Sequence, residues 1–275
     1  MKSSRRRLTG IAGALICSIG MLGWMQNAGQ GGPEPADPVL LKRGARVYNN
    51  TCATCHGKDG SGEGPVAANL MVKPRKFTEG MFKFRSTPSG KLPTDADLYR
   101  TISRGIHTTA MPLFKNLPAD DRWAVVQYIK TFSPRFADPD EYPLNPMAID
   151  NLVPYTPGSV ARGKSLYDLM KCEKCHGENG KGDGPSSHDM TDAWGEPISP
   201  RDLTQPHESK MATSTADIYR TFTTGLDGTP MPSYAEALTD SERWDLANFV
   251  FALQNDDLYS VETHIDEAPE EGETP

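Results

Sequence analysis

The chain has 275 residues, of which 37% are hydrophobic, and a formal net charge of −7 at pH 7. This length is enough for two small domains with separate cores, and this hydrophobic content excludes a protein built from many membrane spans. Residues 1–30 hold four Lys or Arg and no acid, so the remainder has a net charge of about −11. Such an acidic chain argues against nucleic acid as a partner, because phosphate backbones bind basic surfaces.

Residues 1–30 have the pattern of an export signal. The apolar run Leu8–Met25 follows Lys2 and the arginines at positions 5–7, and a basic segment before an apolar one is typical of secretory signals. We therefore expect a periplasmic protein. The run has no clear small-x-small cleavage site and is nearly long enough to span a bilayer. The alternative is an uncleaved N-terminal anchor, which would be the one contact with a membrane.

The rest of the chain is one unit that occurs twice. A CxxCH motif and a glycine-rich loop ending in Gly-Pro appear in both halves, and further matches follow in the same order. The equivalent pairs are Cys52/Cys172, Cys55/Cys175, His56/His176, Pro65/Pro185, Tyr99/Tyr219, Met111/Met231 and Trp123/Trp244. The separation from histidine to methionine is 55 residues in both halves. This shared order indicates the duplication of a domain.

Each unit is predicted to contain three main helices. In the first unit they span residues 39–51, 95–104 (ended by Gly105) and 118–132; in the second they span 159–171, 216–224 (ended by Gly225) and a segment that begins at a capping box, Thr239 to Glu242. Capping boxes begin helices and glycines commonly end them. No segment alternates as a strand would, so we predict an all-α fold.

These patterns divide the chain into five parts. Residues 1–30 are the export segment, 38–133 the first domain, 134–157 a proline-rich linker, 158–255 the second domain and 256–275 an acidic tail that we expect to be disordered. The loops of the two domains differ in length. Pro74-Arg75 lies six residues nearer to its CxxCH motif than Pro200-Arg201 does, and the segment that follows it is longer.

The CxxCH motif predicts covalent haem. Two thiols add to the haem vinyl groups, and the following histidine binds the iron. We therefore predict two haem c groups, attached through Cys52 and Cys55 and through Cys172 and Cys175, with His56 and His176 as iron ligands. A four-thiolate zinc site would need both units to share one metal, a thioredoxin-like pair would need an α/β frame, and CxxC disulfides would be strained.

The two units resemble class I cytochrome c domains over about residues 38–132 and 158–253. The resemblance implies a glycine and an aromatic residue where the first helix crosses the last: Gly44 and Tyr48 with Tyr128, and Gly163 and Tyr167 with Phe249, although the second unit has one extra residue before its motif. It also implies that the carbonyls of Pro65 and Pro185 accept a hydrogen bond from the histidine rings. Such a bond orients an iron-ligating histidine.

Met111 and Met231 are the predicted sixth ligands of the two irons. Both precede a proline, follow a glycine-capped helix and occupy equivalent positions; class I cytochromes carry their axial methionine in such a loop. His107 is the rival ligand in the first unit, but nothing matches it in the second. Arg75 and Arg201 follow prolines in matching loops, and a guanidinium suits a haem propionate.

We expect electron transfer between redox proteins of unknown identity and no enzymatic activity. One alternative is the electron-transfer subunit of a larger membrane or periplasmic oxidoreductase. Another is a dihaem cytochrome c peroxidase, which would need an iron with an open position; a methionine in each unit argues against it.

Overall fold

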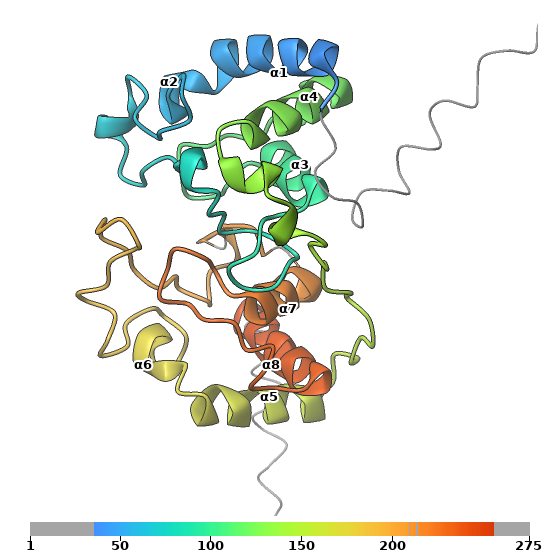
Figure 1. Ribbon diagram of the computed structural model, residues 1–275. Coiled ribbons are helices and arrows are strands. Elements are labelled where there is room, and N and C mark those ends of the chain that lie inside the picture. The colour runs from blue at the N-terminus through green and yellow to red at the C-terminus, as the bar shows by residue number, and fades with distance from the viewer. Residues whose placement is uncertain (1–35, 209, 213, 256–275) are drawn as a thin grey trace, which may run out of the picture.

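The computed structural model describes residues 36–208, 210–212 and 214–255. The predicted export segment and the acidic tail lie outside the described residues. Two helical bodies lie one above the other, each around its own core (Figure 1). In the described ranges no strand forms, and the one extended pairing is an isolated bridge between Thr191 and Pro197. The all-α fold class is therefore confirmed. No helix in the described part is both long and apolar enough to cross a membrane.

The first body contains α1 (Pro38–Thr51), α2 (Ala53–His56), α3 (Asp95–Arg104) and α4 (Ala119–Lys130), with the short 3-10 turns η1 (Ala67–Asn69) and η2 (Phe77–Glu79). Helix α3 begins at a capping box, in which Thr94 and Asp97 each accept a backbone N–H of the other. It ends at Gly105, whose φ of +67° an L side chain rarely adopts. Helix α4 packs against both α1 and α3.

The second body repeats this arrangement with α5 (Pro157–Leu169), α6 (Glu173–His176), the 3-10 turn η5 (Pro206–Glu208), α7 (Thr215–Thr224) and α8 (Asp240–Leu253). Our prediction that the first helix of this unit continues to residue 171 was wrong. Helix α5 ends at Leu169, and Lys171 adopts a left-handed conformation with φ +62°. This turn accommodates the extra residue before Cys172 and leaves the helix itself in register.

Both bodies are built on a close crossing of their first and last helices. A Cβ on Gly44 would lie 2.1 Å from the carbonyl oxygen of Ala124, and a Cβ on Gly163 would lie 2.1 Å from that of Asp245. Only glycine allows backbones to approach so closely. The rings of Tyr48 and Tyr128 pack with centroids 5.3 Å apart, as do those of Tyr167 and Phe249. The predicted crossing residues are confirmed in both units.

The proline-rich segment between the bodies packs against both of them. It contains η3 (Pro134–Ala137) and η4 (Pro139–Glu141). Phe136 and Leu144 are buried in the first core. Further along, Val153 packs against the second core, and the carbonyl oxygen of Asp150 accepts the indole N–H of Trp244 at 3.0 Å. This segment therefore helps to fix the two bodies relative to each other.

The segments whose lengths differ between the repeats meet where the bodies touch. From the longer segment of the first unit, the buried Arg85 forms an ion pair with Asp227 at 2.8 Å and donates to the carbonyl oxygen of Thr224 at 2.7 Å. From the longer loop of the second unit, Trp194 donates its indole N–H to Glu79 at 2.5 Å. Each unit thus contains one longer segment that contacts the other unit.

Candidate functional site

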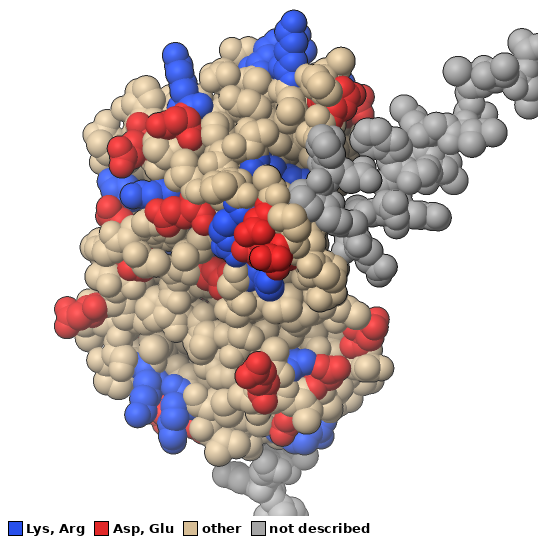
Figure 2. Space-filling view, in the orientation of Figure 1, with Lys and Arg blue, Asp and Glu red and all other residues tan. Residues whose placement is uncertain are grey.

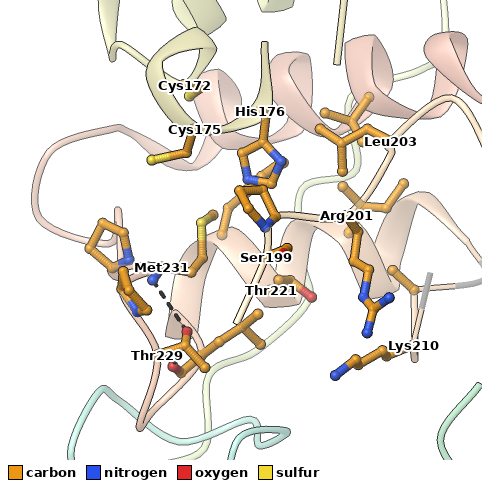
Figure 3. A pocket seen from close by; sticks show the side chains of 18 of the residues that line it. Cys172, Cys175, His176, Ser199, Arg201, Leu203, Lys210, Thr221, Thr229 and Met231 are labelled. Carbon is orange, nitrogen blue, oxygen red and sulfur yellow. Dashed lines mark hydrogen bonds between the residues drawn. The ribbon is translucent and has the colours of Figure 1, made fainter. Parts of the chain in front are cut away.

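A cavity of about 230 Å3 in the second body brings together the predicted site residues of that unit. Cys172, Cys175 and His176 lie at its wall around α6, and Met231 enters from the loop after α7 (Figure 3). The remaining wall is largely apolar and comes from several elements, including Met190, Ile198, Leu203, Ile218, Phe222 and Val250. Burial raises the pKa of the Cys172 thiol to about 11. The cavity therefore presents two thiols, an imidazole and a thioether to one apolar space.

His176 is held by the short helix α6 and by the glycine that ends it. The backbone N–H of His176 bonds the carbonyl of Cys172, and the Tyr167 hydroxyl donates to the carbonyl of Gly177 at 2.6 Å. The ring Nδ1 is buried without a hydrogen-bond partner. Burial lowers the pKa of the ring, and the backbone carbonyl of Arg201 opposes that change. A neutral imidazole is the form that binds a metal.

The methionine loops of the two units are built in the same way. In the second unit Leu226 N–H bonds the carbonyl of Met231 at 3.1 Å, and the Met231 N–H donates to Thr229 Oγ1 at 3.2 Å (Figure 3). Ile106, Met111 and Thr109 form the same pair of bonds at the same lengths in the first unit. Since α3 and α7 both end at a glycine directly before this loop, each methionine is fixed relative to its helix end.

The first site repeats the histidine arrangement. The Tyr48 hydroxyl donates to the carbonyl of Gly57 at 2.7 Å. His56 Nδ1 lies 3.2 Å from the carbonyl oxygen of Arg75, and its ring stacks on Phe77 with centroids 4.5 Å apart. Burial is the main cause that lowers the His56 pKa. Met111 packs against the same core as Cys52.

The roles predicted for Pro65 and Pro185 are corrected by these contacts. The carbonyl that meets His56 belongs to Arg75 and not to Pro65. His176 Nδ1 forms no hydrogen bond with Pro185, and the backbone carbonyl that raises the pKa of its ring belongs to Arg201. Both prolines are exposed. The carbonyl acceptor of His56 comes from a loop that folds back over the histidine. In the chain, Arg75 follows His56 by 19 residues.

His107, the rival ligand of the first unit, is exposed, and its backbone N–H bonds the carbonyl of Lys210 at 3.2 Å in the other body. Arg201 lines the second cavity. Arg75 stacks over Trp194 at 4.2 Å and keeps one buried Nη1 without a partner.

Among the lining residues of the second cavity that sequence reasoning missed, Lys83 and Phe84 come from the first unit. The longer segment of that unit was the one available indication that it reaches beyond its own domain.

The donor set of each unit fits a covalently attached haem. All four cysteines in the described part of the chain are free thiols, each pair next to a partly buried histidine. In the second unit the cavity also offers a thioether and largely apolar walls, and an apolar surround is what excludes water from a haem.

Comparisons with known proteins agree with this geometry. Residues 39–129 match the family described as cytochrome c oxidase, cbb3-type, subunit III, and residues 160–254 match the family described as cytochrome c. A chain of the reducing HAO-like protein complex of Kuenenia stuttgartiensis has 43% sequence identity and a TM-score of 0.73. That similarity covers 77% of this chain and 96% of the other. Among curated proteins, no sequence is significantly similar.

Proposed function

Since this chain belongs to the cytochrome c family and carries two covalently bound haem c groups, one in each of two tandem domains, we propose that it passes single electrons between redox proteins in the periplasm. Proteins with such domains are electron carriers and are typically exported. The predicted basic and apolar N-terminal segment supports export.

The site residues divide into three roles. Cys52 and Cys55, and Cys172 and Cys175, hold the two haems; His56 and His176 bind the irons on one side, and Met111 and Met231 on the other. Haem iron supplies reversible one-electron chemistry, and a methionine ligand raises its reduction potential. Burial lowers the pKa of both histidines, which favours the neutral imidazole that binds a metal.

The observation that carries this proposal is the convergence in the second cavity. Two thiols, His176 and Met231 line the same apolar space although up to 59 residues separate them in the chain. If a histidine and a methionine held each iron, neither iron would have an open position for a substrate, which favours electron transfer over peroxidase chemistry. The matching loops of the first unit extend the same argument to His56 and Met111.

The mass of the mature protein tests the attachment. After acid–acetone extraction, the intact chain should retain the mass of two haems, and a Cys172→Ala/Cys175→Ala variant should retain one. The same loss from Cys52→Ala/Cys55→Ala would establish one haem per domain. Retention of two haems in either variant would contradict the assignment.

A second candidate is a subunit of a larger oxidoreductase. The similarity to a chain of the HAO-like complex supports it, because it covers nearly the whole of that chain. Size-exclusion chromatography of the native cell extract separates the two functions. A free carrier elutes near the 30.1 kDa of the chain, and a subunit elutes with a larger complex that contains other redox centres.

A further inference from the structure

Four basic side chains gather between the two domains. We call them the interdomain cation cluster: Arg75, Lys83, Arg201 and Lys210. The pKa of Lys83 is lowered to about 7, mainly by burial and then by Lys210, Arg75 and Arg201. The pKa of Lys210 is lowered to about 8 by burial and by the two arginines. Each lysine thus lies close enough to the other cations for their positive charge to lower its pKa.

The cluster combines residues of both domains around the second cavity. Lys83 belongs to the first domain but lines this cavity together with Arg201 and Lys210. Arg201 and Lys210 lie at the end of the cavity away from Cys172 and Cys175 (Figure 3). Because the cysteines bind the vinyl edge of a haem, the other end is where the haem carboxylates belong.

The position of Lys83 is fixed by its neighbour in sequence. Arg85 is fully buried and is held by Asp227 and by the carbonyl oxygen of Thr224, both in the second domain. The carboxylate of Asp227 also accepts from the Ser89 hydroxyl and from the Gly90 N–H of the same first-domain segment. Asp227 therefore anchors this segment at two places, with Lys83 next to the cavity.

No described acid forms an ion pair with the two lysines of the cluster. Among the described residues, the ammonium groups of Lys83 and Lys210 form no ion pair or side-chain hydrogen bond, and Arg75 Nη1 is buried without a partner. The nearest acids have other partners: Asp227 is paired with Arg85, and Glu79 accepts from the Trp194 indole. Asp192, whose charge favours the protonated forms of Arg75 and Lys83, accepts from the backbone N–H groups of Trp194 and Glu196. Partly buried cations without counter-charges are costly, so this arrangement calls for a bound anion.

We propose that the interdomain cation cluster binds haem carboxylates, and that Lys83 of the first domain binds those of the second domain's haem and raises its reduction potential. The inference rests on the proposed function, since it needs a haem in the second cavity. A ferric haem carries one more positive charge than a ferrous haem, so a nearby cation favours reduction. The second haem site is then incomplete without the first domain.

The test is a spectroelectrochemical titration of the full-length haem-loaded chain. A Met111→His background lowers the potential of the first haem, so the remaining high-potential wave belongs to the second. In this background, Lys83→Met should shift the reduction equilibrium of the second haem about five- to tenfold toward the ferric form, the size expected for the loss of one partly buried charge. A tenfold shift corresponds to about 59 mV for one electron.

Three variants separate charge from structure. Lys83→Arg keeps the positive charge and should therefore keep the reduction potential of the second haem. If Lys83 only filled space, the differently shaped arginine would not restore that potential. Lys42→Gln removes a first-domain charge from the exposed side of α1 and should leave the wave in place. Lys210→Gln removes a cation of the same cluster from the second domain and should shift the wave as Lys83→Met does, which keeps the test available if Lys83→Met does not fold.

The outcomes distinguish this inference from the proposed function. One haem per chain, or no high-potential wave in the Met111→His background, would contradict the proposed function. Two haems with the expected wave, unmoved by both Lys83→Met and Lys210→Gln or moved equally by Lys42→Gln, would overturn the inference alone. A larger shift of the first haem than of the second, measured in a Met231→His background, would also overturn it.

Discussion

Arg85 and Asp227 form an ion pair at 2.8 Å that joins the two domains, with the Arg85 side chain fully buried and that of Asp227 13% exposed. The Arg85 side chain has no exposed surface, whereas Arg104, in a second interdomain ion pair among the described residues, is 46% exposed and lies 3.1 Å from Asp217. Asp227 occupies the position equivalent to His107 in the first unit, so the two repeats use this position differently. The contact therefore joins the two domains through residues that are not equivalent in the two repeats.

We predict that Asp227→Ala destabilises the chain strongly. It leaves the buried guanidinium of Arg85 without its counter-charge, which typically costs about 3–5 kcal/mol. Denaturant unfolding of the haem-loaded protein, followed by fluorescence and haem absorbance, measures the change. The matched control, Arg104→Gln, removes a half-exposed partner and should cost no more than about 1 kcal/mol. Equal losses for the two variants would show that burial does not set the strength of this contact.

The helix crossing of the second domain gives a second prediction within a single helix. A Cβ on Gly163 would meet the Asp245 carbonyl at 2.1 Å, whereas a Cβ on Gly158 has its nearest neighbour, Arg162 Nη1, at 3.6 Å. Gly163→Ala should therefore destabilise the protein by about 1–3 kcal/mol or more, because α5 and α8 must separate. Gly158→Ala should be neutral or stabilising by up to about 1 kcal/mol. Thermal unfolding of both variants decides between them, and a tolerated Gly163→Ala would contradict the close crossing.

The methionine ligands give a spectroscopic prediction. Ferric haem with a sulfur ligand has a weak absorption band near the red end of the visible spectrum. Met111→Ala and Met231→Ala should each remove about half of this band and lower one of the two potentials. His107→Ala should change neither, because that side chain is exposed. If Met111→Ala left the band intact while His107→Ala altered it, the ligand assignment of the first haem would be wrong.

Part of the fold follows from local sequence. The prediction for residues 95–104 agrees with α3 because the capping box at Thr94 and the glycine at 105 are signals that act within one helix. The end of α5 could not be predicted in the same way. It depends on the left-handed turn at Lys171. The one-residue insertion before Cys172 indicates that the backbone must adjust somewhere, but it does not indicate at which residue.

The repeat showed which site residues to compare, and the structure brings His176 and Met231 to one cavity as their equivalent positions suggested. The predicted hydrogen-bond acceptor of the His56 ring was wrong. The backbone carbonyl of any residue can accept this bond, and the path of the loop decides that Arg75 supplies it. The contributions of Lys83 and Trp194 were missed because they cross between domains. The differences in loop length identified both segments as unusual but did not indicate which residues of the other domain they contact.

A fourth prediction concerns electrostatic steering of partners. Acidic and basic side chains are interspersed on the face shown in Figure 2, while residues 256–275 contain eight Asp or Glu and no Lys or Arg. Electron exchange should therefore be faster with a basic redox partner than with an acidic one and should slow as salt rises, since surface charges are screened over about 8 Å at physiological ionic strength. Deletion of residues 256–275 should weaken this salt dependence in stopped-flow measurements.

Two results would contradict that prediction. A rate that does not depend on salt in either form would exclude steering. A salt dependence that the deletion leaves unchanged would transfer the effect from the tail to the haem domains.

The central claim is that two haems, each with ligands on both sides, exchange single electrons. A coulometric titration followed by visible spectroscopy, with hydrogen peroxide and a reduced donor added at the end, tests it most directly. We predict two reversible one-electron steps per chain, low-spin spectra in both oxidation states and only slow, bleaching oxidation by peroxide. A high-spin iron with an open position, together with sustained peroxide turnover on the order of 10 per second, would contradict the account.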